Sequence, residues 1–176
     1  MAIVINGSGT VTGLAVGGLP DGTVDDGTLA VNSRGTVLQV INAKTETLVT
    51  LSSNTYTDTG LTASITPSST SSKILVIVNQ NGMKTHNNNT ANDIGVMLLR
   101  GSTQINNFSR EYGFTGTTQA TAMATFSTSY LDSPSSTSAV TYKTQFSNMD
   151  GGGAGGTVYA QTASSESTII LMEIAG

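Results

Sequence analysis

The 176-residue chain lacks cysteine altogether and is poor in charged residues. Without cysteine, neither disulfide bonds nor thiolate metal sites can hold the fold together. Charged residues make up 10% of the chain, far below the roughly 25% of ordinary soluble domains. Glu, Lys, Leu and Ala are too scarce to sustain long helices. These absences exclude a disulfide scaffold and argue against a helical fold.

Basic residues are few and scattered, and the formal net charge is −4. They are Arg34, Lys44, Lys73, Lys84, Arg100, Arg110 and Lys143. Because neutralising several phosphates needs a cluster of Lys or Arg, we expect no nucleic-acid binding and no attraction to an anionic membrane. We also expect no membrane insertion, since the longest apolar stretch, Ile74 to Val78, is far shorter than the roughly 20 residues that span a bilayer. The N-terminus lacks the features of a secretory signal, so a soluble protein is expected.

The abundant Thr, Ser, Asn and Gly residues predict short strands joined by polar turns. Alternating apolar and polar residues at 61–65, 120–130 and 140–146 indicate half-buried strands. The aliphatic runs at 73–79 and 94–99 indicate strands buried on both faces. Further apolar segments lie at 36–41, 47–51 and 168–174. We therefore predict that residues 35–176 form an all-β, antiparallel β-sandwich that resembles a jelly roll.

Residues 1–34 differ from the rest because glycines interrupt every short apolar piece, and such a segment has no core of its own. We interpret it as an extended N-terminal arm that packs on a partner. The apolar residues expected to anchor it are Ile3, Val4, Ile5, Val11, Leu14, Val16 and Leu19. The sandwich strands carry few of the charges that protect sheet edges in monomers, so we expect neighbouring subunits to cover some edges or faces.

Few residues suggest catalysis, and we predict no enzyme, no cofactor and no metal site. The single histidine, His86, could act as a general base oriented by Asp93, but an exposed loop histidine is the favoured interpretation. Of the carboxylates that could serve a glycosidase, Glu173 stands out because it lies within an apolar strand. It would face outward or pair across a subunit interface. The glycine run 151–156 lacks the Lys-Ser/Thr of a phosphate-binding loop and predicts a hairpin connection.

One polar segment with interspersed aromatic residues, 104–118, predicts a loop that could contact glycans, because aromatic rings stack on sugars while amides and charges bond hydroxyls. The residues concerned are Asn106, Asn107, Phe108, Arg110, Tyr112 and Phe114. The alternative is that these aromatic residues cover the end of the sandwich or a subunit contact.

Five segments resemble fibre-like virion proteins of tailed bacteriophages, particularly marine and cyanobacterial ones. They are residues 5–14 (INGSGTVTGL), 18–24 (GLPDGTV), 34–40 (RGTVLQV), 57–76 (TDTGLTASITPSSTSSKILV) and 98–103 (LLRGST). The resemblance implies a homotrimer, made in the bacterial cytoplasm and incorporated in the virion. Its arm would bind other virion proteins, and its sandwich would face outward to aid attachment to a host glycan or protein.

Members of that group often carry a long shaft after the arm, whereas here Asp25 is followed within ten residues by the sandwich. A compact protein of this kind suits a capsid decoration protein that stabilises the shell as well as a fibre or adhesin. A glycan depolymerase is a third, less favoured alternative.

The sequence predicts that Val76, in the middle of the run 73–79, is central to the core. A charged substitution such as Val76→Asp is expected to be among the most damaging, because a buried unpaired carboxylate costs several kcal/mol. Loss of the β-sheet signal in circular dichroism, or a much lower denaturation midpoint in urea, would be the expected result. A midpoint close to that of the unmodified protein would contradict this assignment of the core.

Overall fold

A computed structural model describes residues 4–5, 11–12, 36–85, 93–113, 121–149 and 156–176. The chain divides into two compact units, Met1–Arg34 and Gly35–Gly176, and each is described by itself. In the first unit, strands β1 (Val4–Ile5) and β2 (Val11–Thr12) pair antiparallel. The predicted arm residues Ile3, Leu14, Val16 and Leu19 lie outside the described residues.

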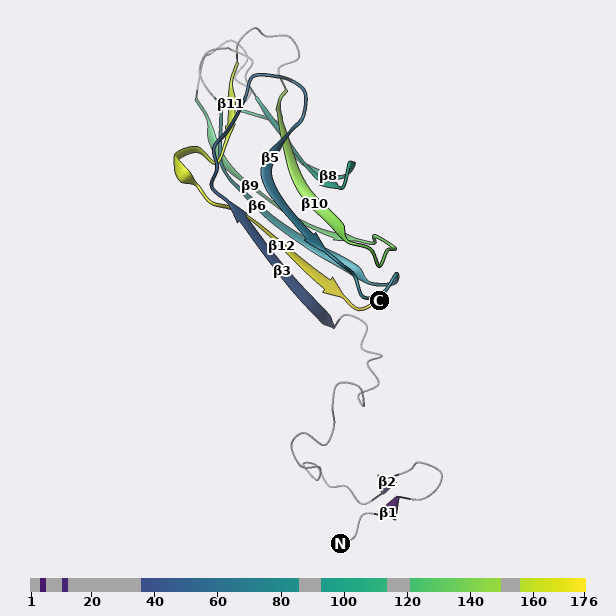
Figure 1. The fold of residues 1–176 in the computed structure, drawn as a ribbon. Helices are drawn as coiled ribbons and strands as arrows, with labels where there is room; N and C mark the ends of the chain where they lie inside the picture. The colour runs from purple at the N-terminus through teal and green to yellow at the C-terminus, as the bar shows by residue number, and fades with distance from the viewer. Residues whose placement is uncertain (1–3, 6–10, 13–35, 86–92, 114–120, 150–155) are drawn as a thin grey trace. The chain divides into compact units, whose positions relative to one another are not determined.

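The second unit is built of strands (Figure 1). They are β3 (Val37–Thr45), β4 (Val49–Leu51), β5 (Thr57–Ile65), β6 (Lys73–Thr85), β7 (Ile94–Arg100), β8 (Thr103–Tyr112), β9 (Met123–Asp132), β10 (Val140–Asn148), β11 (Val158–Ala160) and β12 (Ser167–Ile174). In the described part of the chain the only helical segment is the 3-10 turn η1 (Thr162–Ser164). No helix among these residues is long and apolar enough to cross a membrane.

Two antiparallel sheets pack against each other, which confirms the predicted β-sandwich (Figure 1). The small sheet has the order β5-β10-β7-β8. In the large sheet, the long strand β6 pairs with β9 along one edge and with β12 and then β11 along the other. Strands β3 and β4 pair in turn with β12 and β11. The pairs β11/β12 and β4/β3 therefore each act as one interrupted strand.

The strand pairings are nested along the chain. The hairpin β7–β8 is innermost, and the pairs β6–β9, β5–β10 and β3–β12 follow outward in sequence. Most of these contacts join residues far apart in the chain. The outermost backbone hydrogen bond runs from Ala175 N to Thr36 O, at 2.9 Å, and joins the last strand to the residue before β3.

Apolar side chains alternate toward the interior between the sheets, as period-2 strands require. The predicted alternation of β5, β9 and β10 is confirmed by the burial pattern. The larger of two core clusters contains Leu61, Ala63, Ile65, Ile74, Val76, Val78, Leu98, Tyr142, Ile169 and Leu171. The smaller cluster contains Met83, Ile94, Val96, Phe146, Val158 and Ala160. Val76 is 0% exposed.

The expectation that both aliphatic runs are buried on both faces holds for only one of them. Every residue of 94–99, in β7, is buried. In the run 73–79, by contrast, only alternate residues are buried; Leu75 and Ile77 are half-buried, and Lys73 and Asn79 are exposed. The prediction was wrong for 73–79 because the outer face of the large sheet is apolar without being covered by the described chain.

Gly82 occupies an irregular part of β6 that only glycine fits. Its φ is +61°, and a Cβ atom there would lie 2.6 Å from the backbone nitrogen of Thr162 and 2.8 Å from Cβ of Ser165. Thr162 Oγ1 also donates a hydrogen bond to the Gly82 carbonyl. The bulge of β6 and the turn that separates β11 from β12 thus contact each other directly.

This contact predicts unequal effects for two Gly→Ala substitutions. Gly101, in the β7–β8 turn, also has a positive φ, +59°, but a Cβ there would meet nothing within 4 Å. Gly101→Ala is therefore expected to lose only about 1 kcal/mol of unfolding free energy from backbone strain. Gly82→Ala adds a clash with backbone atoms and is expected to lose about 3 kcal/mol or more. Urea denaturation followed by circular dichroism measures both, and equal losses would contradict the role assigned to the Gly82 contact.

Candidate functional site

The segment predicted to be a glycan-binding loop is an edge strand over most of its length. Residues 103–112 form β8, which pairs with β7, so the prediction of a loop there is wrong. The regular pairing is interrupted by register shifts, one of which inserts a bulge between Ser109 and Tyr112. In this bulge Glu111 adopts a positive φ of 57°, and Arg110 and Glu111 are exposed. The local departure from alternation explains why the sequence suggested a loop.

The aromatic and amide side chains of β8, at the edge of the small sheet, mostly contact β9, at the edge of the large sheet. Phe108 packs against both core clusters. The Tyr112 ring meets the Phe126 ring edge-on at 5.1 Å, and its hydroxyl donates to the carbonyl of Met123 at 2.8 Å. Asn106 Nδ2 donates to Thr128 Oγ1 at 2.8 Å.

These contacts correspond to the alternative interpretation, in which aromatic side chains cover the sandwich. Asn107 is half-buried. With its amide turned to suit its neighbours, it donates to the carbonyls of Val96 and Ser109 at 3.1 and 2.9 Å. Phe114 lies outside the described residues. On the described strand, Arg110 is the exposed member of the predicted set.

Of the two predicted acid–base candidates, the structure describes Asp93 alone. His86 lies outside the described residues. Asp93 is 3% exposed at the start of β7, where its backbone carbonyl accepts a hydrogen bond from Met149 N at 3.0 Å. Among the described residues, no group of three or more His, Cys, Asp or Glu side chains is placed to hold a metal ion.

A buried carboxylate, Glu173, lies on the inner face of β12 and has partners within its own chain. It accepts hydrogen bonds from Gln39 Nε2 at 2.5 Å, Ser68 N at 2.7 Å and Ser68 Oγ at 2.6 Å. Burial alone would raise the pKa of Glu173, but the hydrogen bonds from Gln39 and Ser68 lower it to about 2. The prediction that Glu173 faces outward or pairs across a subunit interface is therefore wrong. Strand alternation places it inward, where it binds the β5–β6 turn.

Asp132, at the end of β9, is another buried carboxylate, and both of its oxygens accept hydrogen bonds. Arg100 Nη1 donates to both of its carboxylate oxygens at 2.9 Å, and Tyr142 Oη donates to Oδ2 at 2.7 Å. Burial, and then the hydrogen bond to Asp132, hold the pKa of Tyr142 well above its usual range. These groups link β7, β9 and β10 across the two sheets. A carboxylate held in this way is suited to a structural role.

A layer of buried polar side chains separates the two core clusters. Thr59 and Thr144 hydroxyls lie 2.6 Å apart, and Thr144 Oγ1 donates to Gln80 Oε1 at 2.8 Å. Gln80 Nε2 in turn donates to Ser167 Oγ at 3.0 Å. All four of these residues, and Gln161 beside them, are 0% exposed.

Gln161 completes this polar layer by binding backbone groups. With its amide oriented to suit its neighbours, it donates to the carbonyls of Thr47, Thr59 and Ala160, each at 3.2 Å, and accepts from Ser167 Oγ at 3.1 Å. Its own φ of 57° is left-handed, which marks the turn between β11 and β12 as strained. The layer has no exposed member that could meet a substrate, and it is a structural feature that the sequence did not reveal.

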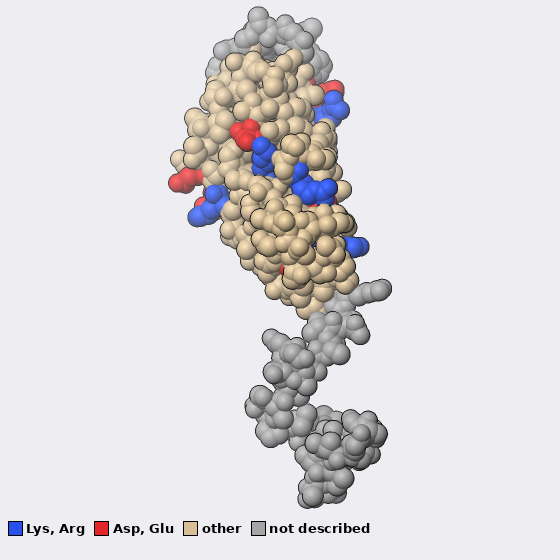
Figure 2. All heavy atoms as spheres, turned by 45° about the vertical axis from the view of Figure 1, so that its right-hand side comes forward, with Lys and Arg blue, Asp and Glu red and all other residues tan. Residues whose placement is uncertain are grey.

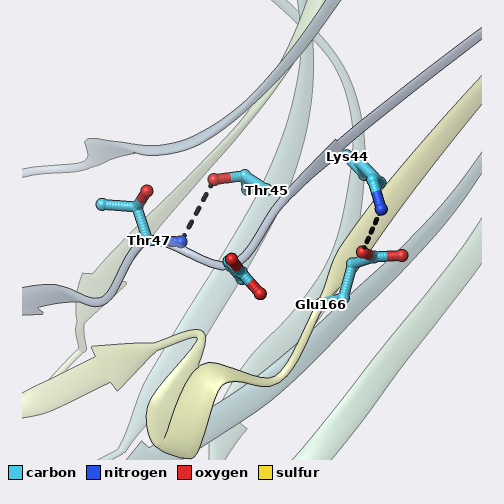
Figure 3. Close-up of a pocket in the computed structure, with 5 residues that line it drawn as sticks. Lys44, Thr45, Thr47 and Glu166 are labelled. Atoms are coloured by element: carbon cyan, nitrogen blue, oxygen red, sulfur yellow. Dashed lines mark hydrogen bonds and ion pairs between the residues drawn. The ribbon is translucent and has the colours of Figure 1, made fainter.

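A shallow surface pocket of about 300 Å³ lies where β3 ends and β12 begins (Figure 3). It is lined by Lys44, Thr45, Glu46, Thr47 and Glu166. Lys44 Nζ lies 2.7 Å from Glu166 Oε2, and the hydrogen bond and charge of Glu166 raise the pKa of Lys44. Lys44 consequently stays protonated, so it cannot act as a base. Both partners are largely solvent-exposed, and such ion pairs stabilise a fold little.

The outer faces of the two sheets differ sharply in character. The small sheet carries charge there: Lys143 Nζ donates to Asp58 Oδ2 at 2.9 Å, and Gln145 Nε2 donates to Asp58 Oδ1 at 2.7 Å. Figure 2 shows basic and acidic groups next to one another on the face it presents. On the large sheet, the register aligns Val40, Met172, Leu75 and Leu131 in one row across four strands. The apolar residues in the runs 73–79 and 168–174 already carried this signal, but the run 73–79 was predicted to be buried on both faces.

Comparison with known proteins assigns no family: no protein-family model matches the chain, and a search of curated proteins finds no significant match.

The environment of Glu173 predicts a specific pH dependence. Its folded-state pKa, about 2, lies below its ordinary value of 4.5, so its contribution to stability is present above pH 4.5 and is lost as the pH falls toward 2. The difference in unfolding free energy between the unmodified protein and Glu173→Gln should be on the order of 2 kcal/mol larger at neutral pH than near pH 2. Urea titrations at several pH values measure it.

The matched control is Glu166→Gln, at the exposed ion pair with Lys44. Its effect on stability should be small at every pH, because solvent screens the pair. A constant difference for Glu173→Gln between pH 7 and pH 2 would show that the folded-state pKa of Glu173 is not depressed.

Proposed function

We propose that this protein is a virion structural component of a tailed bacteriophage, a fibre- or adhesin-like homotrimer that is anchored by its N-terminal arm and aids host attachment. The observation that carries the proposal is the resemblance of five segments to fibre-like virion proteins. Three of these segments supply framework strands: residues 34–40 lead into β3, 57–76 include β5 and the start of β6, and 98–103 include the β7–β8 turn. These three segments thus fall on the framework of the sandwich, whereas the other two belong to the arm.

The strand order supports the narrower proposal of a jelly-roll fold. A jelly roll is a sandwich of eight strands in two sheets. If β3 with β4 and β11 with β12 each count as one interrupted strand, the second unit has eight strands in two four-stranded sheets. Its pairings are nested about the β7–β8 hairpin, as in a long hairpin that is rolled up into two layers.

A structural role is also supported by how the buried polar groups are used. Asp132 and Glu173 are bonded to neighbouring side chains and backbone, and the polar layer around Gln80 is closed to solvent. A glycoside hydrolase needs two carboxylates flanking a substrate site. Neither Asp132 nor Glu173 meets this requirement, because each is bonded within its own chain, which leaves the depolymerase alternative with less support.

Capsid decoration remains the main alternative to a fibre or adhesin. It is favoured by the short distance in sequence between Asp25 and the first sandwich strand at Val37, which leaves no room for a shaft. Labelling purified virions with antibody against this chain separates the two: label at the tail supports a fibre or adhesin, and label over the head supports decoration. Virions without label would contradict both.

The arm is expected to determine incorporation into particles. In the full-length chain, Val11→Asp combined with Leu14→Asp should lower the number of copies per virion severalfold, because a charged side chain cannot be buried against a partner without a large desolvation cost. Quantitative immunoblotting of purified particles measures this. Thr10→Asp combined with Thr12→Asp, which changes the same net charge at polar positions, should have a smaller effect. Unchanged incorporation of the first variant would contradict anchoring by the arm.

A further inference from the structure

We propose that the outer face of the large sheet is the surface on which copies of this chain pack against one another. This apolar face is defined by Val37, Val40, Leu75, Ile77, Leu131, Ile170, Met172 and Ile174. The inference deepens the proposed homotrimer, on which it rests, by assigning its contact surface.

The register shows that the apolar residues form continuous rows. The row that joins Val40, Met172, Leu75 and Leu131 is apolar across all four strands. The next row contains Asn42, Ile170, Ile77 and Ser129, and the one after it contains Lys44, Thr168, Asn79 and Ser127. A further row lies on the other side of the Val40 row, away from Asn42, and contains Val37, Ile174 and Lys73. The face is therefore apolar toward the start of β3 and becomes polar along that strand.

The exposure of this face is unusual for a surface that meets only water. Val40 is 53% exposed and Leu131 is 52% exposed, at the two outer strands of the sheet. Strands with apolar residues on both faces are typical of sheets covered on both sides. Here the inner face packs against the small sheet, and the outer face has no cover from the described part of the second unit.

Charge favours a second copy as the occupant. The small sheet carries an Asp58–Lys143 ion pair on its outer face and so is suited to solvent. Of the four rows on the large sheet, the only charged members are Lys44 and Lys73, which lie toward opposite ends of the strands. No carboxylate interrupts the rows. Two such faces can approach without like charges meeting in their apolar centre.

The size of the face is suitable for part of an oligomer interface. Four strands at about 4.8 Å spacing and the three rows that contain apolar residues, at about 6.7 Å spacing, give a projected area of about 400 Å². This is close to the largest apolar patch of typical monomers and below the roughly 800 Å² that each partner buries in a stable complex. The flanking edges at β3 and β9 must therefore also contribute to the contact.

The gradient of polarity along the strands favours one orientation of the copies. If the symmetry axis runs parallel to the strands, each apolar row packs at the level of the same row in the next copy. An axis in the plane of the sheet and perpendicular to the strands would reverse the strand direction between copies and, unless it passed through the Val40 row, would place apolar rows against more polar ones. We therefore expect a cyclic assembly with its axis along the strands, in which the β3 starts of all copies lie at one end.

The test is the mass of the full-length chain in solution. The monomer has a mass of 18.0 kDa, and sedimentation velocity of the unmodified protein at micromolar concentration is expected to give three times this value. Val40→Glu combined with Leu131→Glu should weaken association about tenfold or more and shift the mass toward the monomer, because both carboxylates would lose their hydration in the contact. Both positions are more than half exposed, so the variant should keep its β-sheet circular dichroism.

The matched control places the same two charges on the small sheet. Thr62→Glu combined with Thr141→Glu changes exposed positions there and should leave the mass unchanged. If the unmodified protein is a trimer and the Val40/Leu131 variant, still folded, remains one, the apolar face is not the contact and the homotrimer itself still stands. If the unmodified protein is monomeric, both the face and the homotrimer are rejected. Antibody labelling of virions then still decides the structural role separately.

The absence of cysteine allows a second readout. Met172→Cys introduces a single thiol in the middle of the proposed contact, and Thr141→Cys introduces one on the opposite sheet. A short bifunctional thiol reagent should link the Met172→Cys chains to each other and leave the Thr141→Cys chains unlinked. Equal linking of the two variants would overturn the assignment of this face.

Discussion

The buried hydrogen bonds among Gln80, Thr144, Thr59, Ser167 and Gln161 are the constraint on which the rest of the sandwich depends. They come from both sheets and lie where β6 bulges and where β11 gives way to β12. Each of these groups, left without a partner in the interior, would cost about 1–3 kcal/mol. A slip of β5, β6, β10 or β12 by one residue would break bonds of this layer, so the layer helps to fix the register of these four strands.

The same layer explains why the chain has two core clusters and an interruption between β11 and β12. Toward one end, Ile74, Val76 and Leu171 pack with Tyr142; toward the other, Phe146 and Val158 pack with Met83. The polar layer lies between them, and the strained turn at Gln161 supplies the side chain that completes it. The backbone strain at Gln161 is thus offset by the hydrogen bonds that its side chain makes in the polar layer.

Much of the fold was accessible from the sequence because burial in strands is periodic. The alternation in 61–65 and 140–146 correctly predicted β5 and β10. The bulged strand β8 was missed, since its register shifts break the period of two. The polar layer and the partners of Glu173 were inaccessible, because many of their hydrogen bonds join residues from 64 to 134 positions apart, through side chains whose neighbours depend on the tertiary fold. The apolar outer face was visible in the aliphatic runs, but periodicity alone does not say what covers it.

Nested pairing has a consequence for synthesis on the ribosome. Val37, at the start of β3, pairs with Ile174, so the two are 137 residues apart in the chain. At a translation rate of about 5–20 residues per second, β3 waits on the order of 10 seconds for its partner. During that time its apolar residues are exposed without a neighbouring strand. The innermost hairpin β7–β8 is complete much earlier, so the sandwich must close from its centre outward, with its first-made strand paired last.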